Sequence, residues 1–318
     1  MGMPLGRLLV RRVVAAIGVL WVVSILLFSA THVLPGDPAA RILGNRATPE
    51  TLAELRSRMG LDRPYLVQYA DWITDFVTGE VTSLATGRSV WPALRTRAGN
   101  SLLLGATALV LAIGLGFAVG LASGMQAGHP TDHTLTVGAL IGLSVPDFVI
   151  AALCIGIFAL ALDILPPVSV LPAGTTPFDR PGILVLPAVS LALPTGAWIS
   201  RFVRAAVVDA RLAPNVEAAR LAGLSPARVN FRHLLPGVMG SVAQAMAAAS
   251  LFLIGGSVVV EQLFAFPGLG SMLTTAVRVK DVSTVLAVGL VTAAAAIAAF
   301  SLADIVGLLA NPRLRRTR

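Results

Sequence analysis

The stretch SLLLGATALVLAIGLGFAVGLASG, residues 101–124, carries no charged side chain along its whole length. The hydrocarbon core of a bilayer is about 30 Å thick, so a helix needs about 20 apolar residues to cross it. Inside lipid, a helix satisfies its backbone hydrogen bonds without a partner segment. Residues 101–124 are therefore predicted to span a membrane as a helix.

The composition of the whole chain agrees with this prediction. Of its 318 residues, 56% are hydrophobic and 13% are charged, whereas a typical soluble chain is about 25% charged. The mean hydropathy is +0.82. Five further apolar segments are long enough to cross a bilayer, at roughly 10–33, 135–162, 183–205, 237–260 and 284–310. We therefore expect an all-α integral membrane protein with about six transmembrane helices.

The first apolar segment follows basic residues, as the apolar core of a signal peptide does. Arg7, Arg11 and Arg12 precede the run 13–30. This run is longer than the core of a signal peptide, which has about 7–15 residues, and no cleavage site of small residues follows it. We expect a retained membrane anchor.

The arginines indicate the orientation of the spans. Cytoplasmic loops are enriched in Lys and Arg. With the amino terminus inside, the cytoplasmic parts hold Arg7, Arg11, Arg12, Arg201, Arg204, Arg211, Arg220, Arg228, Arg232, Arg313, Arg315, Arg316 and Arg318, and the short outer loops hold Arg180, Arg278 and Lys280. We expect both termini to be cytoplasmic and the chain to lie in a bacterial cytoplasmic membrane. This distribution explains the net charge of +8 better than nucleic-acid binding does.

These spans divide the chain into four regions. Residues 1–33 hold the cytoplasmic tail and the first span, and residues 34–99 form an extracytoplasmic helical segment. Residues 100–310 form the core with the other spans and a cytoplasmic loop at 206–236, and residues 311–318 form a basic cytoplasmic tail.

The outer segment 34–99 carries the signals of two helices. Thr48 and Pro49 are typical of a helix start, and Gly60 of its end. A second helix is expected to begin near Pro64 and to end at Gly79, with an apolar stripe of Tyr65, Tyr69, Trp72, Ile73 and Phe76. We favour packing of this stripe on the protein's own outer surface over stacking against a substrate.

The cytoplasmic loop lies within RFVRAAVVDARLAPNVEAARLAGLSPARVNFRHLLPG, residues 201–237. Asn215 is expected to cap a short helix that runs to Ala222, and Gly223 to form the turn after it. Ser225 and Pro226 would then cap and open a second short helix. Two helices around a glycine elbow would make a compact basic knob that could dock on a partner protein. A solvated basic connector remains the alternative.

The sequence of this loop resembles the EAA signature of ABC importer permeases. Glu217-Ala218-Ala219, Gly223 and the later Leu235-Pro236 match it, with His233 where the signature has isoleucine. Five other stretches resemble the peptide/nickel branch of that family: LPGDP at 34–38, GLDRPYLVQY at 60–69, SLATGRSV at 83–90, LPAVSLALPT at 186–195 and EQLFAFPGLG at 261–270. Departures from the branch lie at 79–83 and directly after His233.

The resemblance implies a type I ABC importer permease that depends on a binding protein. It implies a homologous second permease, two ATPase subunits that bind ATP and Mg, and an extracytoplasmic substrate-binding protein. This chain would form half of the pore and bind no cofactor itself. Dipeptides or oligopeptides are the expected substrates; nickel, glutathione or another small solute is the alternative, and an ion-coupled secondary transporter is a less favoured one.

The residues themselves argue against an ATPase. A phosphate-binding loop needs a lysine after a glycine-rich turn, and the single lysine, Lys280, stands between Val279 and Asp281. We therefore expect a subunit without catalytic activity, driven through the cytoplasmic loop. The residues expected to couple it to the ATPases are Asn215, Glu217, Ala218, Ala219, Arg220, Gly223, Ser225, Pro226 and Arg228.

Polar residues within the spans are candidates for the pore. A charged side chain inside a membrane must face protein or water, so Asp147 and the nearby Ser144 are pore-lining candidates; a hydrogen-bonded contact between helices is the alternative. Asp304 is expected to be structural. His129 and His133 could bind a metal only with a further ligand, so no metal site is predicted. Cys154 is the single cysteine, which excludes an intrachain disulfide.

Overall fold

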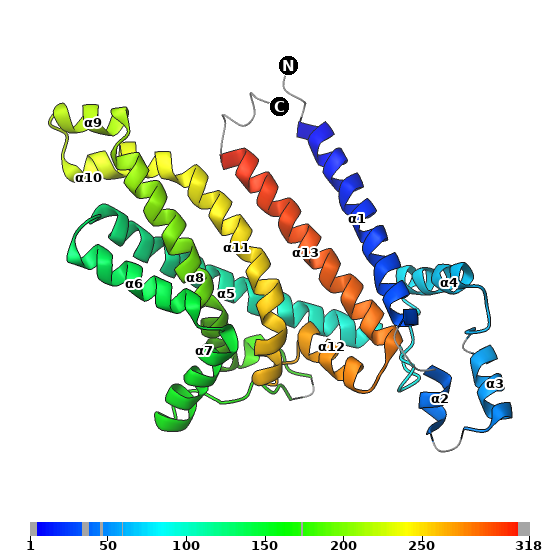
Figure 1. The fold of residues 1–318 in the computed structure, drawn as a ribbon. Coiled ribbons are helices and arrows are strands. Elements are labelled where there is room, and N and C mark those ends of the chain that lie inside the picture. Colours follow the sequence, from blue (N-terminus) through cyan, green and yellow to red (C-terminus); the bar gives the residue numbers. More distant parts are fainter. Residues whose placement is uncertain (1–4, 34–37, 45–46, 59, 173, 311–318) are drawn as a thin grey trace.

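The structure is a computed structural model that describes residues 5–33, 38–44, 47–58, 60–172 and 174–310. Helices dominate this part of the chain (Figure 1). Long helices are α1 (Leu5–Val33), α5 (Trp91–Met125), α8 (Gly182–Arg211), α11 (Leu235–Leu263) and α13 (Val282–Ala310). Shorter ones are α2 (Pro38–Leu43), α3 (Pro49–Arg58), α4 (Tyr65–Thr78), α6 (Pro130–Ser144), α7 (Asp147–Cys154), α9 (Pro214–Leu221), α10 (Pro226–Val229) and α12 (Leu269–Arg278). A π-helical turn, η2 (Ile155–Ala161), continues α7, a 3-10 turn, η3 (Pro177–Asp179), precedes α8, and η4 (Asn230–Leu234) links α10 to α11.

Most of the predicted spans are confirmed as long apolar helices. Within the described residues, four segments are long and apolar enough to cross a membrane: Val10–Thr31, Trp91–Met125, Gly182–Arg211 and Val282–Leu302. The predicted span 237–260 lies inside α11, although the side chains of residues 251–255 are outside the described part. The basic tail 311–318 also lies outside the described residues.

The predicted span 135–162 is not a continuous helix, which corrects the sequence-based expectation. It breaks after α6, and α6 and the α7–η2 segment are bent by 101°. Val145 is extended (φ −90°, ψ 123°) because the ring of Pro146 disfavours a helical conformation in the residue before it. The pair is therefore one broken span or a re-entrant segment.

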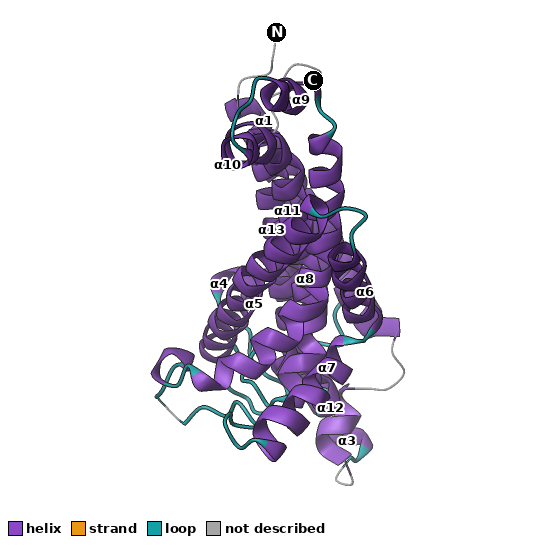
Figure 2. Cartoon of the chain, turned by 90° about the vertical axis from the view of Figure 1, so that its left-hand side faces the viewer, coloured by secondary structure: helices purple, strands orange, loops and turns teal. Residues whose placement is uncertain are grey.

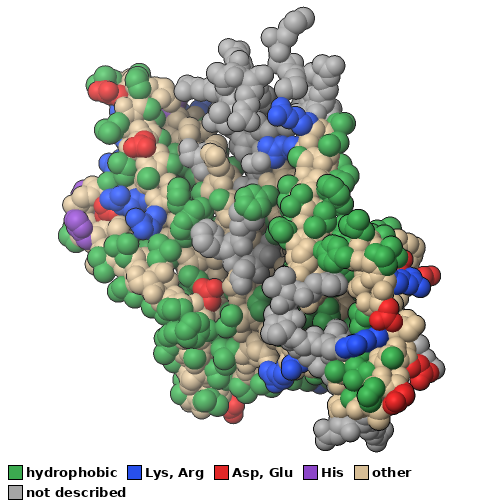
Figure 3. Space-filling view, turned by 45° about the vertical axis from the view of Figure 1, so that its right-hand side comes forward, with side chains coloured by type: hydrophobic (Ala, Val, Ile, Leu, Met, Phe, Trp, Pro, Cys, Tyr) green, Lys and Arg blue, Asp and Glu red, His purple; other side chains and the backbone are tan. Residues whose placement is uncertain are grey.

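The ends of the helices fall at two ends of the molecule. The first turn of α1, the last turn of α13 and the short helices α9 and α10 lie at one end, and α2, α3, α4 and α12 lie toward the other (Figures 1 and 2). On the face drawn in Figure 3, hydrophobic side chains predominate, and charged side chains gather over the helices that precede α5. The first helix thus begins, and the last helix ends, at the same end of the molecule as α9 and α10.

Helix α8 is the centre of the bundle. Of its apolar stretch, 61% is buried, against 22% for α5 and 11% for α1. Gly116, Gly120 and Gly124 of α5 face it so closely that a Cβ on any of them would lie within 2.7 Å of an α8 atom. Small residues at every fourth position allow the backbones of two membrane helices to approach in this way.

The outer segment packs on the bundle as the sequence predicted. Tyr65 and Tyr69 of α4 form hydroxyl hydrogen bonds with Ser29 (2.6 Å) and Ser24 (2.7 Å) of α1. Trp72 is buried in a cluster with Phe28, Leu286 and Leu290, from α1 and α13. The helix boundaries are also confirmed: the amide of Thr51 donates to the Thr48 hydroxyl (3.3 Å), and Gly60 and Gly79 have φ of +67° and +82°.

Candidate functional site

The cytoplasmic loop predicted from the sequence forms a compact knob, residues 214–229, that contains α9 and α10. Helix α9 begins two residues earlier than expected, because Ala213 is its N-cap and Pro214 its first residue. Asn215 is therefore not the cap; its side-chain amide donates to the carbonyl of His233 (3.4 Å) and links α9 to η4. Proline fits the first helical position because the amide that it lacks would have no helical partner there.

The glycine elbow is confirmed. Gly223 has φ +74°, a left-handed conformation that is unfavourable for residues with a Cβ. Its amide donates to the carbonyl of Arg220 (3.0 Å), and the amide of Leu224 donates to that of Ala219 (3.2 Å). Ser225 occupies the N-cap position of α10, as expected, but its side chain makes no capping hydrogen bond.

One face of the knob is fixed to the bundle. Val216 and Ala219 of α9 and Val229 of α10 are buried in a single apolar cluster. The same cluster contains Val203 and Val207 of α8 and Val238 and Val242 of α11. The knob is therefore held by the two helices that it connects.

The other face of the knob is exposed. Of the residues predicted to couple the chain to a partner, the exposed ones are Asn215, Glu217, Ala218, Arg220, Gly223, Ser225, Pro226 and Arg228, while Ala219 is buried. Leu221 and, next to the knob in η4, Phe231 are 83% and 74% exposed. Within the part of the chain that the structure describes, Glu217, Arg220 and Arg228 form no ion pair. The exposed face of the knob therefore carries both charged and large apolar side chains.

The two candidate pore residues have different surroundings. Asp147 begins α7, and its carboxylate lies against Gly256 of α11, where a Cβ would overlap it. The hydroxyl of Ser144 donates to the carbonyl of Leu140 one turn earlier in α6 (2.8 Å), and the side chain is exposed. Asp147 therefore lies between two helices, whereas Ser144 hydrogen-bonds within its own helix.

The segment around His129 and His133 has a feature that sequence reasoning missed. Both histidines are exposed, but Asp132 between them is buried and accepts two hydrogen bonds from Arg204 of α8, at 2.6 and 2.7 Å. Among the described residues, no group of three or more His, Cys, Asp or Glu side chains lies together as a metal site would require. The sequence did contain a signal for this ion pair: Asp132 lies just before a predicted span, and arginines lie near the end of the next span.

Two more buried acids organise the end of the bundle opposite the knob. Glu261 of α11 is fully buried and accepts hydrogen bonds from the Ser101 hydroxyl (2.6 Å) and from the amide of Gly270 (2.7 Å), at the start of α12. Asp281 accepts from the Ser83 hydroxyl (2.5 Å) and the amide of Leu84 (3.0 Å). Glu261 therefore fixes the stretch 261–270 to α5, and Asp281 fixes the start of the stretch 83–90 to the residue before α13. The sequence had marked both stretches without giving them a role.

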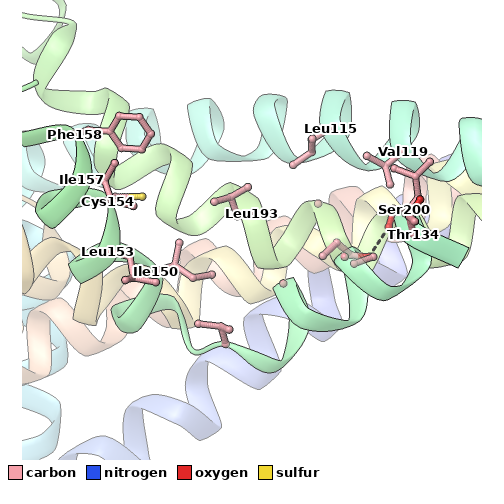
Figure 4. A pocket seen from close by; sticks show the side chains of 17 residues that line it. Leu115, Val119, Thr134, Ile150, Leu153, Cys154, Ile157, Phe158, Leu193 and Ser200 are labelled. Atoms are coloured by element: carbon pink, nitrogen blue, oxygen red, sulfur yellow. Dashed lines mark hydrogen bonds between the residues drawn. The ribbon is translucent and has the colours of Figure 1, made fainter. Parts of the chain in front are cut away.

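An apolar groove lies beside the bend of the broken span. It has a volume of about 510 Å³ and lies between α5, α6, α7 and α8. Figure 4 shows Phe158 and Cys154 toward one end of it and Thr134 and Ser200 toward the other. Its lining is almost entirely apolar, and its polar side chains are those of Thr134 and Ser200.

A bundle of long apolar helices of this kind is the fold of a multi-pass membrane protein. Comparison with known proteins identifies the family. Residues 112–316 match the model of the binding-protein-dependent transport system inner membrane component, and residues 5–102 match the model of the N-terminal part of such membrane components. The chain belongs to this family of ABC importer permeases.

Similar proteins are known over the whole length of the chain. A Brucella abortus (strain 2308) protein whose name describes a peptide transport system permease is 32% identical over 313 residues, which is 97% of this chain and 98% of the relative. The glutathione transport system permease protein GsiC of Salmonella choleraesuis (strain SC-B67) is 31% identical over 306 residues, or 96% and 97% of the two chains.

A solved structure supports the fold. The crystal structure of an amino acid ABC transporter with histidines contains a chain that matches with a TM-score of 0.53 and 16% identity, over 68% of this chain and 93% of that one. The agreement confirms the type I ABC permease fold expected from the sequence.

Proposed function

We propose that this chain is the permease subunit of an ATP-driven importer of dipeptides or oligopeptides, and that it forms half of the translocation pore. The nearly full-length similarity to a Brucella abortus protein named as a peptide transport permease supports this substrate class. A homologous second permease would form the other half of the pore. An extracytoplasmic binding protein would deliver the substrate, in a bacterial cytoplasmic membrane.

The exposed face of the knob carries the proposal. Glu217, Arg220 and Arg228 have no ion-pair partner among the described residues, and Leu221 is almost fully exposed. Burying that leucine in a partner would be favourable by roughly 2 kcal/mol. In this proposal, one of two ATPase subunits provides the groove, and Arg220 and Arg228 meet acidic side chains there.

In this proposal, the partner ATPase subunits supply the energy for transport. ATP and Mg bind to the ATPases, whose closure moves the knob and, through it, the spans around the pore. This chain holds no cofactor and catalyses no reaction in the proposal. Both of its termini face the cytoplasm, together with the knob.

Import of glutathione by the same architecture is the second candidate. It is supported by the similarity to the glutathione permease of Salmonella choleraesuis, which is nearly as high as that to the peptide permease. Nickel or another small solute is a further alternative. In each case Asp147 and Ser144 are proposed to line the pore, the former where α7 meets α11.

Site-specific crosslinking tests the docking of the knob. Cys154 is the single cysteine, so a Cys154→Ser background accepts one new cysteine at Ala218, on the exposed face. In membranes that contain the whole complex, a bifunctional maleimide–amine crosslinker should join Ala218→Cys to an ATPase subunit. Ser89→Cys, on the outer segment, is the matched control and should give no such product. Equal products from both positions, or none from Ala218→Cys, would refute the proposal.

Uptake assays test the substrate. Proteoliposomes with the complete complex and its binding protein should accumulate radiolabelled dipeptide when ATP is supplied on the knob side. If labelled glutathione or nickel accumulates and the dipeptide does not, the chain belongs to an importer of that solute instead. Uptake that persists without the ATPase subunits would indicate an ion-coupled transporter instead.

A further inference from the structure

An ion pair connects α6 to α8, near the end of α8 that leads into the knob. The guanidinium of Arg204 donates to both carboxylate oxygens of Asp132, at 2.6 and 2.7 Å. The Asp132 side chain is only 3% exposed, whereas that of Arg204 is 34% exposed. The carboxylate also accepts from the amide of Gly128 (3.0 Å) and the hydroxyl of Thr136 (3.2 Å). Asp132 is thus fixed within the first turn of α6 and held by α8.

A second arginine of α8 makes a parallel connection. Arg211, the last residue of α8, donates to the carbonyls of Gly124 (3.0 Å) and Met125 (2.8 Å), at the end of α5. Charge-assisted hydrogen bonds of this kind are stronger than those between neutral groups. We call Asp132, Arg204, Arg211 and these two carbonyls the clamp.

The clamp lies beside a region where the backbones of α5 and α8 approach each other closely. A Cβ on Gly120 would lie 2.5 Å from the carbonyl oxygen of Ser200, and one on Gly124 would lie 2.7 Å from the Cβ of Val207. Helix α5 therefore contacts α8 directly. Helix α6 also packs on α8, where a Cβ on Gly142 would lie 3.3 Å from that of Ala197, and the ion pair adds a charged connection between these two helices. A buried carboxylate has to stay with its partner, because an unpaired charge in that position is strongly unfavourable.

The knob follows directly after the clamp. Helix α9 begins at Pro214, three positions after Arg211, and its buried residues share an apolar cluster with α8. On the other side, the break at Val145–Pro146 separates α6 from α7 with a bend of 101°. A break of this kind can absorb a change of angle between two rigid parts.

From this geometry we propose that the clamp makes α5, α6, α8 and the knob one rigid body, so that a movement of the knob displaces the α5–α6 hairpin relative to α7. Arg204 is then a positioning residue for transport, since it acts through Asp132 and touches no substrate. This inference rests on the proposed function, because it requires that a partner moves the knob.

The complete complex in proteoliposomes tests the proposal with a matched pair of variants. Arg204→Gln removes the ion pair. Arg201→Gln removes an exposed arginine one turn earlier in α8, which has no ion pair among the described residues. We expect Arg204→Gln to reduce the amount of dipeptide imported per ATP hydrolysed at least about fivefold, while Arg201→Gln keeps the wild-type ratio. The charge swap Asp132→Arg with Arg204→Asp should restore part of the ratio.

A distance measurement tests the same idea without a substrate. Spin labels on Thr134→Cys in α6 and Leu212→Cys beside the knob, in a Cys154→Ser background, report whether the two move together. The distance should be the same in the nucleotide-free and the ATP–vanadate states, and it should change between them when Arg204→Gln is added. Thr134 and Leu212 are both exposed, so labels fit there.

Each outcome decides the question. An unchanged import ratio in Arg204→Gln, or a distance that varies while Arg204 is present, would overturn the proposal. Failure of both Arg204→Gln and the charge swap to assemble would reduce the pair to a folding contact, which also overturns it. Failure of the proposed function itself is distinguishable, because the wild-type complex would then show no binding of ATPase subunits to the knob.

Discussion

Two glycine-to-alanine changes in α5, Gly120→Ala and Gly114→Ala, should have opposite effects on the stability of the protein. Gly120 faces α8, and a Cβ there would lie 2.5 Å from the carbonyl oxygen of Ser200 and 2.6 Å from the Cβ of Val203. Gly114, on the same helix, has nothing within 4 Å of that position. Alanine has a higher helix propensity than glycine by about 1 kcal/mol at both positions, so the difference between Gly120→Ala and Gly114→Ala measures packing alone.

The structure gives the size of that difference. To accept the methyl group of Gly120→Ala, the helices must separate by about 1 Å, and overpacking of this kind costs about 1–3 kcal/mol. Gly114→Ala should be neutral or slightly stabilising. Thermal unfolding of the purified protein in detergent, followed by differential scanning fluorimetry, should therefore give a lower midpoint for Gly120→Ala. Equal midpoints would contradict the close contact of α5 and α8.

Three further changes test other parts of the structure. Glu261→Ala should destabilise the protein by about 1–3 kcal/mol, because the buried amide of Gly270 loses its acceptor, whereas Glu217→Ala on the exposed knob should leave the unfolding midpoint unchanged. Asp281→Asn should increase hydrogen exchange at 82–89, since the carboxylate that accepts from Ser83 is lost; protection equal to the wild type would refute this role. Gly223→Leu should cost about 1–2 kcal/mol at its φ of +74° and abolish import while the protein still inserts; wild-type import with stimulated ATPase activity would count against coupling through the knob.

The long helices were predictable because their signal is local. An uncharged stretch such as 101–124 has one stable arrangement in lipid, and its length alone indicates a span. The helix ends at Thr48, Gly79 and Gly223 were predictable for the same reason, since capping and a left-handed turn depend on one or two neighbouring residues. The aromatic stripe of α4 could be predicted from the helical spacing of its residues alone.

Contacts between distant segments were not predictable from these patterns. The sequence marked a proline at position 146, but the bend of 101° depends on how α6 and α7 pack on α8. Asp132 precedes Arg204 by 72 positions, and no local rule pairs them. At Ala213, the preference of Pro214 for the first helical position outweighed the capping preference of Asn215.

The aromatic cluster of the outer segment has a consequence for biosynthesis. Trp72 packs against Leu286 and Leu290, which the ribosome adds more than 200 positions later. At a synthesis rate of about 5–20 residues per second, α4 waits roughly 10–40 s before α13 exists. During that interval its tryptophan lacks its final surroundings, so a chain truncated before α13 would present this aromatic face to chaperones and proteases.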